Sequence, residues 1–124
     1  MNKTIVASNA PAAIGPYCHA KLAGNTLYTS GQQGVIPATG ELAEGVEGQT
    51  RQAFENLRSI LTAAGMDFSD VVKTVVYLTD INDFAAINAI YAEYFTGEYP
   101  ARSCLEVPAL PKGAVFELEA IAVK

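Results

Sequence analysis

The clearest pattern along the chain is a stripe of apolar residues that recurs at three- and four-residue steps between positions 46 and 64. Its members are Val46, Ala53, Phe54, Leu57, Ile60, Leu61 and Ala64. This spacing gathers side chains on one side of an α-helix, so it predicts a helix that ends at Gly65. A second stripe of the same period predicts another helix, capped by Asp80 or Asn82 and ended by Gly97. This second stripe consists of Phe84, Ile87, Ile90, Tyr91 and Phe95.

Four runs rich in β-branched and aromatic residues predict strands on either side of these helices. They lie at residues 26–30, 71–78, 102–107 and 114–123, with a turn at 110–113. Proline and glycine break the segment around Tyr17 into an extended loop, and residues 31–45 form a second loop. Strands and helices in this order predict an α+β fold with one sheet and about two helices.

The predicted strands are apolar on both faces. In the strand at 71–78, Val72, Val76 and Leu78 point one way, while Val71, Val75 and Tyr77 point the other. Two helices can cover only one face of the sheet, and the chain has no further element for the second face. We therefore expect a homo-oligomer in which the open sheet faces pack together.

The composition is that of a folded domain of ordinary size. We expect the 124 residues to form a single domain (1–124), and the 50% of hydrophobic and 17% of charged residues exclude intrinsic disorder. The net charge of −5 disfavours nucleic acid and anionic lipid as partners. No segment approaches the ~18 apolar residues of a membrane span. The N-terminal segment has no signal-peptide pattern, so we expect a cytoplasmic protein with no membrane or nucleic-acid partner.

Residues that could hold a metal or act as nucleophiles are few. The chain has two cysteines, no CxxC motif and a single histidine, which disfavours both a disulfide scaffold and a zinc site. Phosphate-binding glycine loops and the HExxH metal motif are missing from the sequence. Cys18 and Cys104 are interpreted as small buried thiols, and His19 as a solvated or hydrogen-bonded loop histidine.

Charged residues gather in the last two predicted strands. Arg102, Cys104 and Glu106 alternate along one strand and so share a face, and Glu117 and Glu119 share a face of the next strand. An antiparallel hairpin about the turn between these strands places Cys104 roughly opposite Glu117, and Arg102 near Glu119 or Glu117. The hairpin therefore predicts an arginine and carboxylates on one otherwise apolar face.

This cluster has two interpretations, and the residues alone favour neither. The arginine and the glutamates can neutralise each other as an ion pair at an interface. Alternatively, they form a pocket for a small carboxylic acid, because arginine grips a carboxylate in two places and a partly desolvated glutamate can act as a general base or acid. The second interpretation suits an acid whose neighbouring carbon reacts with water.

Several segments, in order along the chain, carry a resemblance to a known family. They read IGPYCHA, TSGQ, VVKTVVYL, PARSC and LPKGAVFELEAIA. Together they resemble the Rid (YjgF) family, and most closely its reactive-intermediate deaminase A branch, over nearly the whole chain. The resemblance implies a chorismate-mutase-like α+β fold, with a mixed sheet and two helices on one face. It also implies a homotrimer with a central β-barrel and active sites at the subunit interfaces.

The same resemblance implies an enzyme, namely a hydrolase that acts on C–N bonds. This branch hydrolyses 2-aminoacrylate (2-iminopropanoate) and 2-iminobutanoate to pyruvate or 2-oxobutanoate plus ammonia. The reaction protects pyridoxal-phosphate enzymes from damage by these reactive imines. The resemblance implies no cofactor and no metal.

The family's site residues carry over to matching positions of this chain. The resemblance implies that Arg102 clamps the substrate carboxylate and that Glu117 holds and polarises the attacking water. Cys104 contributes mainly its backbone, and Tyr17 of the GPY motif closes the pocket. The other implied substrate-binding residues are Ser30, Gly31 and Asn88. Cys18-His19 departs from the Ser-Gln of many relatives, which leaves substrate preference and pH dependence open.

Three other functions stay open on the sequence. A regulatory module would use the Arg102 pocket to bind a 2-oxo acid without turnover. An RNA-directed role is described for some relatives, but the net charge of −5 and the lack of a Lys/Arg cluster weigh against it. A hydrolase would use Cys104 as its nucleophile and His19 as the base.

Overall fold

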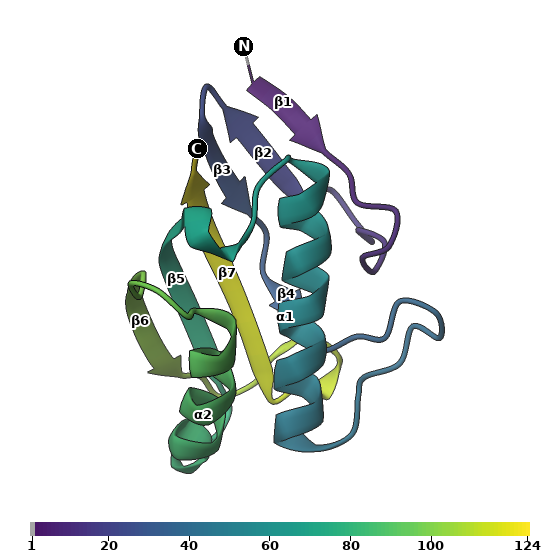
Figure 1. The fold of residues 1–124 in the computed structure, drawn as a ribbon. Helices are drawn as coiled ribbons and strands as arrows, with labels where there is room; N and C mark the ends of the chain where they lie inside the picture. Colours follow the sequence, from purple (N-terminus) through teal and green to yellow (C-terminus); the bar gives the residue numbers. More distant parts are fainter. Residues whose placement is uncertain (1) are drawn as a thin grey trace.

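Residues 2–124, which the computed structural model describes, form one mixed sheet of seven strands with both α-helices on the same face (Figure 1). The strands are β1 (Asn2–Ile5), β2 (Ala20–Ala23), β3 (Thr26–Thr29), β4 (Gln32–Gln33), β5 (Val71–Leu78), β6 (Ala101–Glu106) and β7 (Phe116–Val123). Their order in the sheet is β1-β2-β3-β7-β5-β6, and β4 also pairs with β7. The predicted α+β class is confirmed.

The first predicted helix is confirmed as α1 (Gly45–Ala63). Its apolar stripe faces the sheet, because periodic apolar side chains gain most when one side of a helix is buried. The stripe residues with no exposed surface are Ala53, Phe54, Leu57, Ile60 and Leu61. The chain leaves the helix through Gly65 at a φ of 74°, a left-handed conformation that glycine adopts without a steric penalty.

The second helix is confirmed with a shorter span than its sequence pattern predicts. The 3₁₀ turn η2 (Ile81–Asp83) precedes α2 (Phe84–Tyr94), and the Asp80 carboxylate caps this turn by accepting a backbone N–H at 2.9 Å. The helix ends before the predicted stop at Gly97. Within residues 2–124, neither this helix nor any other is long and apolar enough to cross a membrane.

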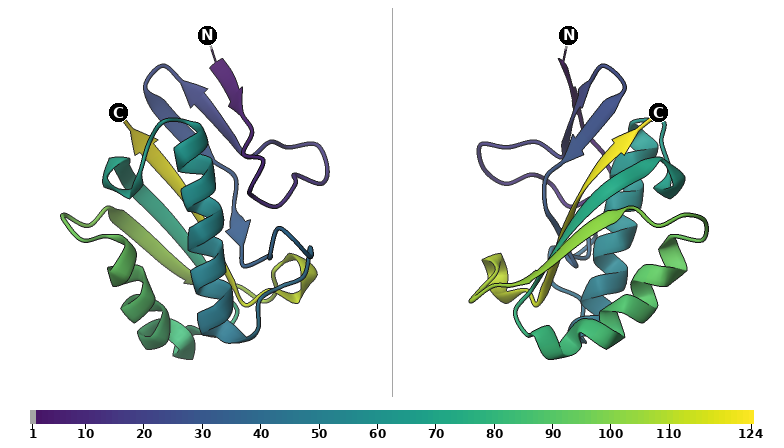
Figure 2. Two further views of the ribbon diagram at one scale, coloured as in Figure 1. Left: turned by 45° about the vertical axis from the view of Figure 1, so that its right-hand side comes forward. Right: turned by 90° about the vertical axis from the view of Figure 1, so that its left-hand side faces the viewer.

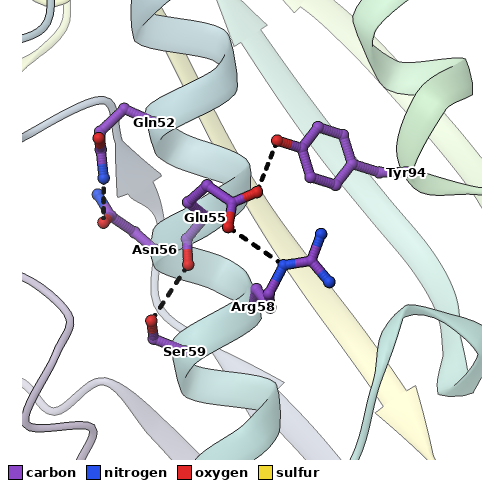
Figure 3. A network of polar contacts seen from close by, with 6 residues as sticks. All are labelled: Gln52, Glu55, Asn56, Arg58, Ser59 and Tyr94. Atoms are coloured by element: carbon purple, nitrogen blue, oxygen red, sulfur yellow. Dashed lines mark hydrogen bonds and ion pairs between the residues drawn. The ribbon is translucent and has the colours of Figure 1, made fainter.

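Aromatic rings fill the space between the two helices. Phe54 stacks on Tyr94 with ring centroids 4.5 Å apart and meets the edge of Tyr91 at 5.7 Å. On the solvent side, the Tyr94 hydroxyl donates a hydrogen bond to Glu55, which also accepts one from Arg58 (Figure 3). These contacts fasten α2 to α1 and fix the position of α2 over the sheet.

The connection through α2 sets the direction of β6. Because β5, α2 and β6 form a β-α-β unit, β5 and β6 run parallel, with Thr74 paired to Arg102. β7 pairs antiparallel with the other edge of β5, so β5 separates β6 from β7. The hairpin predicted from the last two strands is therefore wrong. Its turn exists as the 3₁₀ turn η3 (Pro111–Gly113), which lies on a connection past the intervening strand rather than between neighbours.

The N-terminal region contains strands that the sequence pattern did not predict. β1 pairs antiparallel with β2, and β2 with β3. The predicted loop at 31–45 contains β4 and an isolated bridge between Val35 and Leu42. These strands have two to four residues and mixed polarity, so no period-two alternation marks them. β2 extends the sheet from the edge of β3, β1 extends it from β2, and β4 pairs with β7 beyond the part of β7 that β3 occupies.

Within residues 2–124, no helix covers the face of the sheet opposite α1 and α2 (Figure 2). This face carries Val75 and Tyr77 of β5, Leu105 of β6, Ile121 of β7 and Tyr28 of β3. The side chains of Tyr28 and Leu105 are 50% and 48% exposed. The predicted open apolar face is thus present, and a surface of this kind is typical of an interaction site.

Candidate active site

A cleft of about 600 Å³ opens beside β4 and β7. Its walls come from the N-terminal segment, the end of β3, β4, β7 and the η3 turn. Four residues that the family resemblance singles out line it: Tyr17, Ser30, Gly31 and Glu117. The fold therefore brings most of the predicted pocket together, although these residues are far apart in the sequence.

Hydrogen bonds fix the N-terminal wall of this cleft. The Ser30 hydroxyl donates to the Cys18 carbonyl at 2.6 Å, and the Ser30 backbone N–H donates to the His19 carbonyl at 2.9 Å. The Tyr17 hydroxyl accepts the Ile14 N–H at 3.3 Å, and the Tyr17 side chain is 53% exposed. Tyr17 therefore forms an exposed rim of the cleft, whereas Ser30 ties the segment to the sheet.

Glu117 supplies a half-buried carboxylate to the cleft. Its Oε1 accepts a hydrogen bond from Gln33 Nε2 at 3.2 Å, and its Oε2 lies where a side chain on Gly31 would stand. Burial raises the pKa of Glu117, and the negative charge of Glu119 adds to this, while the Gln33 hydrogen bond opposes it. A carboxylate in a cleft with increased proton affinity is suited to act as a general base.

Glu119, the second carboxylate of the cleft, has a different environment. The Tyr77 hydroxyl donates to Glu119 Oε1 at 2.7 Å. This hydrogen bond, with burial, raises the pKa of Tyr77 to about 12, so the phenol stays protonated and keeps donating at neutral pH. Within residues 2–124, no three His, Cys, Asp or Glu side chains come together as a possible metal site.

Arg102 is held against α2 by polar and aromatic contacts. Its Nη1 donates to Asn88 Oδ1 at 2.7 Å, and its guanidinium lies 4.7 Å from the centre of the Tyr91 ring and 5.3 Å from that of Phe84. Arg102, Asn88 and Tyr99 line a hollow of about 460 Å³. Within residues 2–124, the guanidinium forms no ion pair with a carboxylate. Its charge is thus positioned but unneutralised, as an anion-binding group requires.

The two sets of predicted site residues lie on opposite faces of the sheet. Arg102 pairs with Thr74, which is fully buried beneath the helices, whereas Glu117 belongs to the open face. Directly paired residues point to the same face, so Arg102 and Cys104 point toward the helices and Glu117 and Glu119 point away. The predicted placement of Arg102 near Glu119 or Glu117, and of Cys104 opposite Glu117, is therefore wrong within one chain.

The geometry argues against a Cys104–His19 nucleophile. Cys104 packs against the core, and burial raises the pKa of its thiol, although the charge of Arg102 opposes this. His19 precedes β2, four strand spacings or about 19 Å from β6. Its buried ring accepts the Ala7 N–H at Nδ1 (3.0 Å), so Nε2 carries the proton and donates to the Pro11 carbonyl (2.7 Å). His19 is thus a hydrogen-bonded histidine, buried rather than solvated.

Three further residues line the cleft that the sequence did not mark as candidate site residues: Gln33, Pro111 and Lys112. Gln33 lay in a predicted loop, and the other two lay in a predicted turn, so no periodic pattern marked them. Only the pairing of β4 with β7 brings Gln33 to Glu117. Sequence spacing carries no signal for a contact between residues that far apart.

Comparisons with known proteins place this fold. The sequence model of the family described as Endoribonuclease L-PSP matches residues 7–124. The structure also matches a crystal structure of a Rid-family protein, YyfA from Yersinia pestis, with a TM-score of 0.98 and 46% identity over 100% of both chains. The chain belongs to the Rid (YjgF) family. The resemblance predicted from its motifs is confirmed.

Two further relatives of this Rid protein bear on its site. The curated 2-iminobutanoate/2-iminopropanoate deaminase of Salmonella typhimurium is 51% identical to it, over 100% of this chain and 99% of that one. The crystal structure of E. coli TdcF with bound serine matches it with a TM-score of 0.95 and 45% identity over 98% of each chain. Both matches extend over nearly the whole length of this chain.

Proposed function

We propose that this Rid protein is an imine deaminase. It hydrolyses 2-iminobutanoate and 2-iminopropanoate, the tautomer of 2-aminoacrylate, to 2-oxobutanoate or pyruvate plus ammonia. The observation that carries the proposal is the half-buried Glu117 carboxylate in a cleft of a chain 51% identical to a curated 2-iminobutanoate/2-iminopropanoate deaminase. Removal of these imines would protect the pyridoxal-phosphate enzymes that release them.

Arg102 is the proposed clamp for the carboxylate of the substrate. Its planar fork can bind both carboxylate oxygens, and Asn88 and the ring of Tyr91 already hold the guanidinium in place. Arg102 therefore has little side-chain freedom left to lose when the substrate binds. Cys104 follows on the same face of β6, where its backbone would lie beside the reacting carbon.

Glu117 is the proposed base that activates water. It accepts a proton from the water as the water oxygen bonds to the imine carbon, and it passes this proton to the imine nitrogen, which gives a carbinolamine. Glu117 then takes the proton of the carbinolamine hydroxyl and delivers it to the nitrogen as the C–N bond breaks, so the 2-oxo acid and ammonia leave and the carboxylate is restored. Because the pKa of Glu117 is raised, its carboxylate holds a proton more readily than an ordinary glutamate does, which favours a side chain that both accepts and returns the proton.

A neighbouring subunit would complete the site. Arg102 and Glu117 point to opposite faces of one sheet, and the face that carries Glu117 is apolar and uncovered. A homotrimer whose open faces line a central barrel would cover that surface and bring Arg102 of one copy to Glu117 of the next. Tyr17, Ser30 and Gly31 would then close the pocket around the substrate from the same side as Glu117.

Hydrolysis can be tested with imine generated in place. A threonine dehydratase acting on threonine supplies 2-iminobutanoate, semicarbazide competes for it, and 2-oxobutanoate formation is followed with time. We expect faster release with the wild type than without protein, and no acceleration with Arg102→Ala. Equal rates in all three reactions, together with tight binding of 2-oxo acids, would instead identify a binding module without turnover.

A ribonuclease function, which the family's description suggests, is less compatible with this chain. The net charge is −5, and the cleft is lined by two carboxylates, Glu117 and Glu119. Phosphate backbones bind to Lys and Arg surfaces and are repelled by such a cleft. Salt-sensitive RNA binding by the pure protein would contradict this reasoning.

A further inference from the structure

Gln33 stands directly across from Glu117 in the sheet. β4 and β7 pair antiparallel with Gln33 opposite Glu117 and Gln32 opposite Leu118. Directly paired residues project to the same face with their Cβ atoms about 5 Å apart. This register brings the Gln33 amide to the carboxylate, and the Nε2–Oε1 distance is 3.2 Å.

The Gln33 amide holds two groups of the cleft at once. Besides Glu117 Oε1, Nε2 donates to the Pro111 carbonyl of the η3 turn at 3.0 Å. An amide nitrogen has two hydrogens, so both donors of Gln33 are used. Gln33 therefore joins the carboxylate to the turn that forms the opposite wall, and both walls line the same cleft.

The backbone of β4 is itself fixed from α1. Asn56, which is 1% exposed, donates from Nδ2 to the carbonyls of Gln33 at 3.0 Å and Val35 at 2.8 Å. The Asn56 side chain is in turn oriented by Gln52, whose Nε2 donates to Asn56 Oδ1 at 2.9 Å (Figure 3). Gly34 packs directly on the Gln49 backbone of α1. Gln33 thus extends from an immobilised strand.

We propose that Gln33 is a positioning residue for Glu117. Its amide donates hydrogen bonds to Glu117 Oε1 and to the η3 turn. The plane of the carboxylate is thereby fixed, and Glu117 Oε2 is left for the reacting water. Gly31 is part of the same arrangement, since its lack of a side chain leaves room for Oε2. The role of Glu117 as a base rests on the proposed function, whereas the positioning of its carboxylate by Gln33 does not.

The charged groups around Glu117 offer a control substitution that should shift the pKa of Glu117 in the opposite direction. Glu119 on β7 is a like charge, and its hydroxyl partner Tyr77 comes from β5. Lys112 from η3, and Tyr17 and His19 from the N-terminal segment, line the same cleft. Loss of the Gln33 donor raises the pKa of Glu117, while loss of the Glu119 charge lowers it.

Carbon-13 NMR of protein labelled at glutamate side-chain carboxyls measures this directly. The Glu117 signal, assigned with Glu117→Gln, is titrated in the wild type, Gln33→Met and Glu119→Gln. We expect the Glu117 midpoint to move to higher pH in Gln33→Met, which keeps the side-chain length without a donor, and to lower pH in Glu119→Gln. Gln33→Glu, which places a like charge opposite Glu117, serves if Gln33→Met fails to fold and should also raise the midpoint.

Turnover gives the second measurement. In Gln33→Met, kcat for imine hydrolysis should fall by a larger factor than KM rises. The loss of kcat should be several-fold larger at pH values below the wild-type Glu117 midpoint than at pH values above the midpoint of the variant. An unchanged Glu117 titration in a folded Gln33 variant would overturn the proposal. If the wild type hydrolyses no imine but the Glu117 midpoint still moves in the Gln33 variants, the deaminase function is refuted. The role of Gln33 in positioning the Glu117 carboxylate then stands.

Discussion

Arg102 and Glu117 point to opposite faces of one sheet, with β5 between the strands that carry them. Arg102 is held under α2 by Asn88, while Glu117 lies in a cleft on the open face. A substrate as small as a three- or four-carbon imino acid cannot contact both side chains of one chain. Shared sites between copies are therefore the arrangement that uses both residues.

Mixed oligomers test this sharing. Arg102→Ala and Glu117→Gln are each expected to abolish imine hydrolysis when they assemble alone. Refolded together in equal amounts, they should recover about a quarter of wild-type activity, because about one interface in four then pairs an intact Arg102 with an intact Glu117. The measurement is 2-oxobutanoate release, with separately refolded and then mixed proteins as the control. Coassembled but inactive oligomers would contradict the shared site.

Arg102→Lys tests the need for a forked cation. Lysine keeps the charge but cannot bind a carboxylate in two places or stay stacked on the ring of Tyr91. We expect kcat/KM to fall about 10–100-fold, the equivalent of one strong charge-assisted hydrogen bond, mainly through a higher KM. Arg58→Lys on the outer side of α1 is the matched control and should leave the steady-state kinetics unchanged.

Gly31→Ala and Gly34→Ala separate catalysis from stability. A methyl group at Gly31 meets the Glu117 side chain rather than backbone, and this side chain can turn away by giving up its hydrogen bond to Gln33, so the fold is kept while the base is displaced. We expect an activity loss of about tenfold or more with little change in Tm. At Gly34 the methyl group meets the Gln49 backbone instead, so stability should fall by about 1–3 kcal/mol or more. Thermal unfolding and initial rates on both variants check this contrast.

Glu117→Gln should stabilise the protein near neutral pH. Because the folded-state pKa of Glu117 is raised, the folded protein binds more protons than the unfolded chain. Stability is therefore lost as pH rises from the ordinary carboxyl pKa, about 4.3, through the folded-state pKa. We expect a gain of less than about 1 kcal/mol for the variant at pH 7, since the side chain is only half-buried. Urea unfolding of both proteins should show that this gain vanishes below about pH 4. A variant no more stable than the wild type at pH 7 would contradict the prediction.

His19→Ala should loosen the N-terminal wall of the cleft. It leaves the Ala7 N–H and the Pro11 carbonyl without their partners, at a cost of about 2–4 kcal/mol in the free energy of unfolding. His19→Gln, which keeps an acceptor and a donor, should lose less. Amide hydrogen exchange of Ala7 should be faster in His19→Ala, and unchanged protection there would show that other contacts hold this segment.

The sequence by itself determined both helices, β5, β7 and the open apolar face. The reason is that their periodicity is local: the stripe ending at Leu61 and the alternation from Lys73 to Leu78 each report which side of an element is buried. The prediction is wrong for Val71 and Val72, because a β-bulge between Val71 and Lys73 shifts the register, so that Val71 is buried and Val72 exposed. It also determined that Arg102 and Cys104 share a face, as do Glu117 and Glu119. The Rid motifs identified the family because they span nearly the whole chain.

Only the tertiary structure decided which of these faces meet. The crossover through α2 makes β6 parallel to β5, so β7 pairs with the far edge of β5 and Arg102 is separated from Glu117. The pairing of β4 with β7 brings Gln33 to Glu117 across 84 positions of sequence. Strand pairing depends on how distant segments dock rather than on local periodicity, and no spacing within a strand encodes its neighbour.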